Sequence, residues 1–113
     1  MTNPLVLLGA LGQSPWYDFI TRDLVRSGEL ARLIREDGLL GMTSNPTIFE
    51  KAMGAGSDYD AQLRELTASG ASIEDAYWEL VLTDVGHAAD RLRPVYDELN
   101  GYDGFVSVEV SPE

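Results

Sequence analysis

Short strand-like runs alternate with helical patterns along this chain, and that alternation restricts its fold more than any other feature. We expect strands over 15–20, 38–43 and 105–110, because each is a short apolar or aromatic run bounded by turn residues. Apolar residues at helical spacing separate these runs, over 22–36 and again between 46 and 99. Such alternation favours parallel strands joined by right-handed helical crossovers. The sequence therefore predicts an α/β fold.

Proline and asparagine mark the expected ends and breaks of several helices. Asn3 before Pro4 predicts a short first helix, and Asn45 before Pro46 predicts another, since asparagine caps a helix and proline suits its first position. We expect Pro94 to kink or divide the last helical segment.

Two α/β architectures fit the order of the elements. A doubly wound sheet normally has a glycine-rich phosphate loop after its first strand, but residues 18–23 contain no glycine. We therefore expect an eight-stranded (β/α)8 TIM barrel, which needs roughly 250 residues. With 113 residues, this chain would supply the N-terminal part of such a barrel, about three parallel strands, and residues 1–113 contain no sign of a second domain.

The chain is acidic, with 19 acidic residues against 8 basic ones and a formal net charge of -11. This charge repels phosphate backbones and anionic lipids, so we expect neither a nucleic-acid nor a membrane partner. With no cysteine and one histidine, the sequence predicts no metal and no cofactor. The apolar start of the chain has no cationic lead and is too short to span a bilayer, so we expect a cytoplasmic protein.

Each expected strand ends in polar residues, which is where barrel enzymes place their reacting groups. The first ends at Asp18, the second at Thr43, Ser44 and Asn45, and the third at Glu109. A carboxyl group among apolar neighbours is a candidate general acid or base, because desolvation favours its protonated form. From the pattern alone, a helix cap at Asp18 and an arginine partner for Glu109 remain alternatives.

Two motifs resemble those of the transaldolase family. Residues 41–49, Gly-Met-Thr-Ser-Asn-Pro-Thr-Ile-Phe, resemble its signature around a Thr-x-Asn-Pro core. Residues 105–112, Phe-Val-Ser-Val-Glu-Val-Ser-Pro, resemble its Val-Ser-x-Glu-Val strand. Residues 13–30 are similar to the opening of a bacterial branch that is longer than the minimal enzyme and is sometimes fused to a glucose-6-phosphate isomerase. The resemblance covers almost the whole chain.

The resemblance implies a pentose-phosphate enzyme that moves a dihydroxyacetone unit from a ketose phosphate to an aldose phosphate through a Schiff base. At matching positions, Asp18 would be the base in carbon–carbon cleavage. Glu109 would move protons through a water while the Schiff base forms. Asn45 would bind the hydroxyl groups of the donor, and Thr43 would add a further contact. Sugar phosphates are the implied substrates, and a homo-oligomer or a fused isomerase domain is compatible with the family.

The amine nucleophile of the family is a lysine on the next strand, which we expect beyond residue 113, so this chain would be a fragment that is inactive alone. Its single lysine, Lys51, follows an acidic residue in a helix and is expected to be a solvated surface residue. Two alternatives remain. One is a transaldolase-like fructose-6-phosphate aldolase, although that branch tends to carry glutamine where Glu109 stands. The other is a non-catalytic, acidic α/β interaction module.

Overall fold

The computed structural model describes residues 3–110, which form a three-stranded parallel sheet with helices between the strands. In the order in which they pair, the strands are β1 (Trp16–Tyr17), β2 (Gly41–Thr43) and β3 (Phe105–Ser107). Gly41 lies opposite Trp16 on one side and opposite Phe105 on the other. The expected α/β fold with three parallel strands is confirmed, although each strand is shorter than the sequence predicted.

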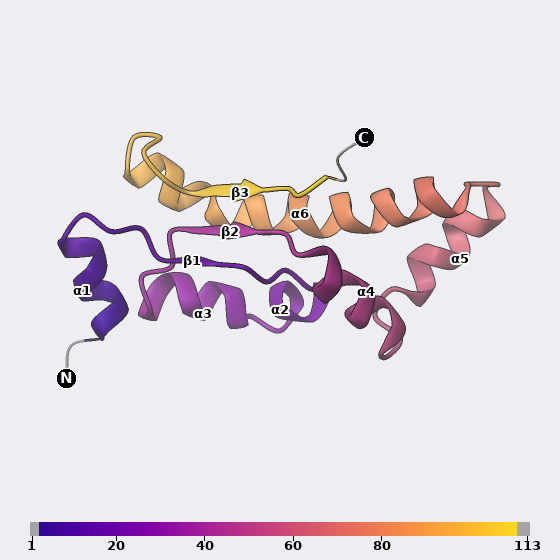
Figure 1. The fold of residues 1–113 in the computed structure, drawn as a ribbon, viewed down its shortest axis with the longest axis horizontal. Coiled ribbons are helices and arrows are strands. Elements are labelled where there is room, and N and C mark those ends of the chain that lie inside the picture. Colours follow the sequence, from indigo (N-terminus) through magenta and orange to yellow (C-terminus); the bar gives the residue numbers. More distant parts are fainter. Residues whose placement is uncertain (1–2, 111–113) are drawn as a thin grey trace.

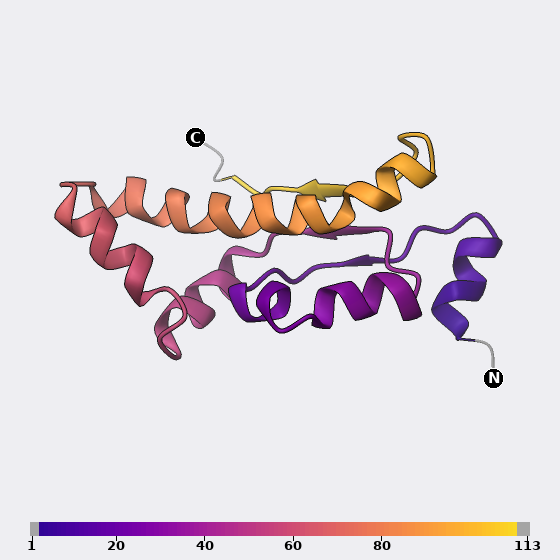
Figure 2. The same ribbon diagram turned by 180° about the vertical axis from the view of Figure 1, so that it is seen from behind.

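The helices of residues 3–110 are α1 (Pro4–Ala10), α2 (Arg22–Arg26), α3 (Glu29–Glu36), α4 (Pro46–Gly54), α5 (Asp60–Ala68) and α6 (Ile73–Glu98). Helices α2, α3 and α6 lie on the same face of the sheet (Figures 1 and 2). Helix α1 lies at the end where the strands begin, and α4 follows the end of β2 (Figure 1). The helical crossovers therefore cover one face of the sheet.

Capping contacts explain where the predicted helices begin. The Asn3 side chain accepts a hydrogen bond from the backbone N–H of Leu5 at 2.9 Å, and Pro4 occupies the first turn of α1. Asn45 caps α4 in the same way. Pro94 lies inside α6 without dividing it, so that α6 remains one helix of 26 residues. The last turns of α6 tilt away from the axis of the preceding turns (Figures 1 and 2).

The hydrophobic core lies between the sheet and the helices that cover it. Met42 of β2, Leu30 of α3 and Leu92 of α6 are all fully buried there. Ile20, in the segment between β1 and α2, is buried in the same cluster. Burial of apolar side chains from three elements and one connecting segment fixes the helices against the sheet.

A buried ion pair joins α2 to α5 and α6. Arg22 Nε lies 2.8 Å from Asp84 Oδ1, and their side chains are 4% and 1% exposed. The Tyr59 hydroxyl donates to Asp84 Oδ2 at 2.6 Å and accepts from the backbone N–H of Arg22 at 3.0 Å. Burial raises the pKa of Tyr59 above its ordinary value, and the bond to Asp84 adds to the effect. This network fixes the start of α2, four residues after Asp18.

The edge strands are more exposed than the sequence predicted. Trp16, Tyr17 and Phe105 are 38%, 39% and 45% exposed. A buried first strand was expected, and that prediction is wrong for this chain. Within residues 3–110, β1 pairs with β2 on one side and no described strand pairs with its other side.

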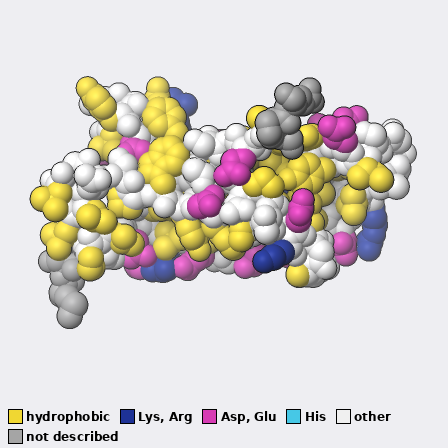
Figure 3. All heavy atoms as spheres, in the orientation of Figure 1, with side chains coloured by type: hydrophobic (Ala, Val, Ile, Leu, Met, Phe, Trp, Pro, Cys, Tyr) yellow, Lys and Arg dark blue, Asp and Glu magenta, His cyan; other side chains and the backbone are white. Residues whose placement is uncertain are grey.

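Apolar side chains are also exposed on α1. Leu5, Val6, Leu7 and Leu8 are between 40% and 48% exposed. The space-filling view shows a hydrophobic group at the lower left, where α1 lies in Figure 1 (Figure 3). Helix α1 has 7 residues, and no helix within residues 3–110 is both long and apolar enough to cross a bilayer.

Candidate active site

Three of the four candidate residues meet at the edge of the sheet where β1 and β2 end. The Thr43 hydroxyl donates a hydrogen bond to Asp18 Oδ1 at 2.5 Å. The Asn45 side-chain amide donates to Asp18 Oδ2 at 3.2 Å. Each oxygen of the carboxylate therefore accepts one hydrogen bond from a different side chain. Two donors from one segment hold the plane of the Asp18 carboxylate in a defined orientation.

The register of the sheet explains why Asp18 and Thr43 meet. Tyr17 of β1 lies opposite Met42 of β2. Because the two strands are parallel, the residues that directly follow Tyr17 and Met42 come side by side at the same edge of the sheet. Asp18 therefore arrives beside Thr43, although 25 residues separate them in the chain.

Asn45 is both a helix cap and a site residue. Its side-chain oxygen accepts from the backbone N–H groups of Thr47 and Ile48, at 3.1 and 3.3 Å, in the first turn of α4. Its side-chain nitrogen donates to Asp18. A side-chain amide has two N–H groups, so Asn45 keeps one that no residue in 3–110 accepts.

Glu109 reaches this edge through its backbone. Its N–H donates to Ser44 Oγ at 2.8 Å, and the Ser44 N–H donates to the Ser107 carbonyl at 2.9 Å. Within residues 3–110 the Glu109 carboxylate makes no hydrogen bond or ion pair, and it does not join the group around Asp18. The four candidates thus separate into a bonded group of three and one residue that approaches from β3.

Sequence reasoning named Ser44 among the polar residues that end the second strand but gave it no role. In the structure Ser44 is 2% exposed and links β2 to Glu109. A signal was available, because Ser44 lies between Thr43 and Asn45 in the motif. The central strand β2 has β3 as its neighbour, so a polar residue directly after β2 can bond the chain that follows β3.

The two candidate carboxyl groups are open to solvent, which differs from what the sequence predicted. Asp18 and Glu109 are both exposed, so residues 3–110 do not remove them from water as expected. The reason is their position, because each follows an edge strand of the sheet. The site of this chain is an open surface on which the described residues do not exclude water.

Lys51 lies in the last turn of α4 and is exposed, as the sequence predicted. An exposed ammonium group on a helix is well solvated, which makes it a poor nucleophile. Within residues 3–110, no group of three histidine, aspartate or glutamate side chains lies close enough together to hold a metal ion.

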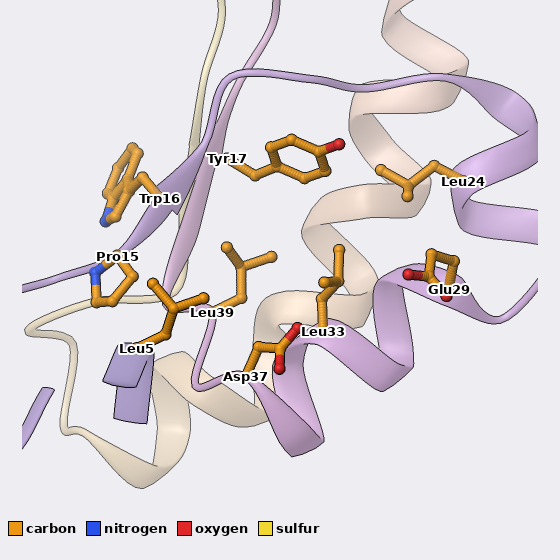
Figure 4. Close-up of a pocket in the computed structure, with 9 residues that line it drawn as sticks. All are labelled: Leu5, Pro15, Trp16, Tyr17, Leu24, Glu29, Leu33, Asp37 and Leu39. Carbon is orange, nitrogen blue, oxygen red and sulfur yellow. The ribbon is translucent and has the colours of Figure 1, made fainter. Parts of the chain in front are cut away.

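An apolar pocket of about 260 Å³ lies elsewhere, between β1, α1 and α3. Tyr17, Leu24, Leu33 and Leu39 are among the side chains that line it (Figure 4). None of the four candidate residues lines this pocket. The polar group at the strand ends is therefore the better candidate for chemistry, because its side chains can bind hydroxyl groups and transfer protons.

Comparison with known proteins shows which family the chain is similar to. Residues 15–113 match the family model described as transaldolase/fructose-6-phosphate aldolase. The chain is 48% identical over 112 residues to a transaldolase of Thermobifida fusca, which amounts to 99% of this chain and 30% of that protein. A transaldolase of Parafrankia is 46% identical over 112 residues, with the same shares covered. Transaldolase 2 of Nostoc punctiforme is 45% identical over 111 residues, 98% of this chain and 29% of that protein.

The chain thus spans about three-tenths of the length of these relatives. The match includes all three strands and both motifs, although Ser111 and Pro112 of the second motif lie outside the described residues. The family folds as a TIM barrel, and residues 3–110 provide three of its parallel strands with their helical crossovers. This chain belongs to the transaldolase/fructose-6-phosphate aldolase family.

Proposed function

We propose that this chain provides the carboxyl groups of a transaldolase active site. In the proposed reaction, a dihydroxyacetone unit passes from a ketose phosphate to an aldose phosphate through a Schiff base. The amine that forms the Schiff base comes from a part of the enzyme outside these 113 residues. The observation that carries this proposal is the Asp18 carboxylate, oriented by Thr43 and Asn45 at the carboxyl end of the strands.

Asp18 is the proposed base for carbon–carbon cleavage. Cleavage needs a carboxylate that takes the proton of a donor hydroxyl group while the bond to the neighbouring carbon breaks. Each oxygen of Asp18 accepts one hydrogen bond and has a further lone pair for that proton. Since the two donors already fix the carboxylate, less orientational freedom is lost when the substrate binds.

Asn45 and Thr43 are the proposed contacts to the donor's hydroxyl groups. Asn45 has one side-chain N–H in addition to the one that Asp18 accepts. The Thr43 hydroxyl donates to Asp18, and its oxygen lone pairs can accept from a substrate hydroxyl. Both residues would therefore bind the substrate and orient the base at the same time.

Glu109 is the proposed proton shuttle for Schiff-base formation and hydrolysis. Those steps move protons between the amine, the carbinolamine oxygen and water. A carboxylate in contact with water can transfer these protons. The exposed Glu109 carboxylate and its position at the end of β3 support this role. In this proposal the two carboxyl groups act in different steps, Asp18 in cleavage and Glu109 in Schiff-base formation and hydrolysis.

The charge of the chain limits what it can contribute to substrate binding. A formal net charge of -11 does not attract a sugar phosphate, so the cationic groups that hold the phosphate are proposed to lie outside these residues. A cytoplasmic location and a place in the pentose-phosphate pathway belong to the same proposal.

A hybrid enzyme tests this function. In the hybrid, this chain replaces the 112 matching residues of the Thermobifida fusca transaldolase. We expect it to convert fructose 6-phosphate and erythrose 4-phosphate into glyceraldehyde 3-phosphate and sedoheptulose 7-phosphate. Release of glyceraldehyde 3-phosphate at the same rate without the acceptor would indicate an aldolase instead. A hybrid that fails to fold, or that folds and shows neither activity, would contradict the proposal.

A further inference from the structure

We propose that Ser44 is a positioning residue that sets the place of Glu109 relative to Asp18. The inference rests on the proposed function, because it concerns how the second carboxyl group of that site is held. Ser44 Oγ accepts the backbone N–H of Glu109 at 2.8 Å, and these residues are 65 positions apart. Of the four candidate residues, Glu109 is the one whose position depends on this contact.

The hydroxyl of Ser44 continues the pairing of β2 and β3 beyond the point where the regular ladder stops. Thr43 lies opposite Ser107, and the Ser44 N–H donates to the Ser107 carbonyl. In a regular parallel ladder, the next acceptor for the Glu109 N–H would be the carbonyl of Ser44. The side-chain hydroxyl of Ser44 accepts it instead, just before the chain enters α4.

Burial makes Ser44 a firm attachment point. Ser44 is 2% exposed, so its side chain is held by packing, whereas Glu109 is exposed and lies past the end of β3. An exposed residue beyond a strand end is free to move unless its backbone is bonded. The bond to Ser44 supplies that restraint.

One segment of three residues therefore holds both carboxyl groups. Thr43 and Asn45 bind the side chain of Asp18, and Ser44 between them binds the backbone of Glu109. Because β2 is the central strand of the three, the segment that follows it lies beside the ends of both β1 and β3. The spacing between the proposed base and the proposed proton shuttle is thus set within residues 43–45.

The test uses Ser44→Ala in the hybrid enzyme, followed by single-turnover kinetics. We expect Schiff-base formation and hydrolysis to slow by about ten- to a hundredfold, since small misplacement of a reacting group has effects of that size. Carbon–carbon cleavage should stay unchanged, because the bonds to Asp18 are made by Thr43 and Asn45. The matched control is Ser72→Ala, which removes a similar bond, from the Asp75 N–H to Ser72 Oγ at 3.1 Å, far from the site.

A double variant separates positioning from general stability. If Ser44 acts through Glu109, then adding Ser44→Ala to Glu109→Gln should slow Schiff-base formation little further. A second pair of variants, Ser44→Thr and Ser44→Val, covers the case in which alanine disturbs folding. Threonine and valine have nearly the same shape, but only threonine has a hydroxyl group. A faster Schiff-base step in Ser44→Thr than in Ser44→Val would therefore show that the hydroxyl group is what matters.

The outcomes distinguish this inference from the proposed function. If Glu109→Gln slows the Schiff-base steps while Ser44→Ala does not, the positioning role of Ser44 is wrong and the proposed function stands. Equal slowing of every step, or full additivity in the double variant, also overturns the positioning role. If Glu109→Gln itself leaves the Schiff-base steps unchanged, the proposed role of Glu109 is wrong, and the positioning role of Ser44 is wrong with it.

Discussion

Thr43 Oγ1 lies 2.5 Å from Asp18 Oδ1, and this hydrogen bond joins the ends of β1 and β2. The bond holds together two side chains that are 25 positions apart in the chain, at the carboxyl edge of a parallel sheet. The same edge carries the reacting groups in barrel enzymes. The geometry of the proposed active site therefore depends on how well the surrounding residues maintain this edge.

Breaking the buried ion pair should destabilise the hybrid enzyme. In Asp84→Ala, Arg22 and the Tyr59 hydroxyl lose their common partner within the core. Removing one partner of a buried pair costs about 3–5 kcal/mol, because a buried charge is left uncompensated. Urea denaturation measures the change. The control is Asp97→Ala, which breaks the exposed pair with Arg93 and should change the midpoint little. Equal effects of the two variants would contradict the assignment of a structural role to the buried pair.

Gly41 should tolerate no side chain. A Cβ at this position would overlap with atoms of the Trp16 indole, which packs directly over the glycine. We expect Gly41→Ala in the hybrid enzyme to lose about 1–3 kcal/mol, as overpacked sites do. Gly86→Ala is the control, because nothing lies within 4 Å of its Cβ and a glycine in a helix is less favourable than alanine. Thermal melts of the two variants should therefore shift in opposite directions. An unchanged midpoint in Gly41→Ala would mean that Trp16 does not pack as described.

The 113-residue chain on its own should not behave as a well-packed monomer. Trp16, Tyr17 and Phe105 are exposed on edge strands, and unpaired edges promote association. We expect it to bind dyes that report exposed apolar surface and to melt over a broad range of temperature. A monomer with a sharp melting transition and slowly exchanging amides in β2 and β3 would show that three strands are sufficient.

The same chain should form no Schiff base. Its single lysine is exposed on α4 and lacks the burial that activates an amine. After incubation with fructose 6-phosphate and borohydride, mass spectrometry should find no adduct. A stoichiometric adduct on Lys51 would refute both the prediction and its assignment as a surface residue.

The sequence was sufficient for features that depend on neighbouring residues in the chain. Asn45 before Pro46 predicted the start of α4, and the alternation of apolar runs predicted three parallel strands. Both signals are local, since caps and periodicity act over a few residues. The position of Asp18 at the end of the first strand followed from the same pattern.

Contacts between distant residues were not predictable in this way. Arg22 and Asp84 are 62 residues apart, and Ser44 and Glu109 are 65 apart. No local pattern marks such pairs, because their meeting depends on how the elements pack. The exposure of Trp16 was missed for a related reason. Aromatic composition predicts a strand, whereas its burial depends on which strands lie beside it.

Step-resolved kinetics of two carboxyl variants in the hybrid enzyme test the central claim most directly. We expect Asp18→Asn to slow mainly carbon–carbon cleavage and Glu109→Gln to slow mainly the formation and hydrolysis of the Schiff base. Loss of a positioned acid or base costs on the order of a hundred- to ten-thousandfold in rate. Single-turnover measurements separate the two steps. Small and equal effects of both substitutions on both steps would contradict the account, because neither carboxyl group would then carry the chemistry assigned to it.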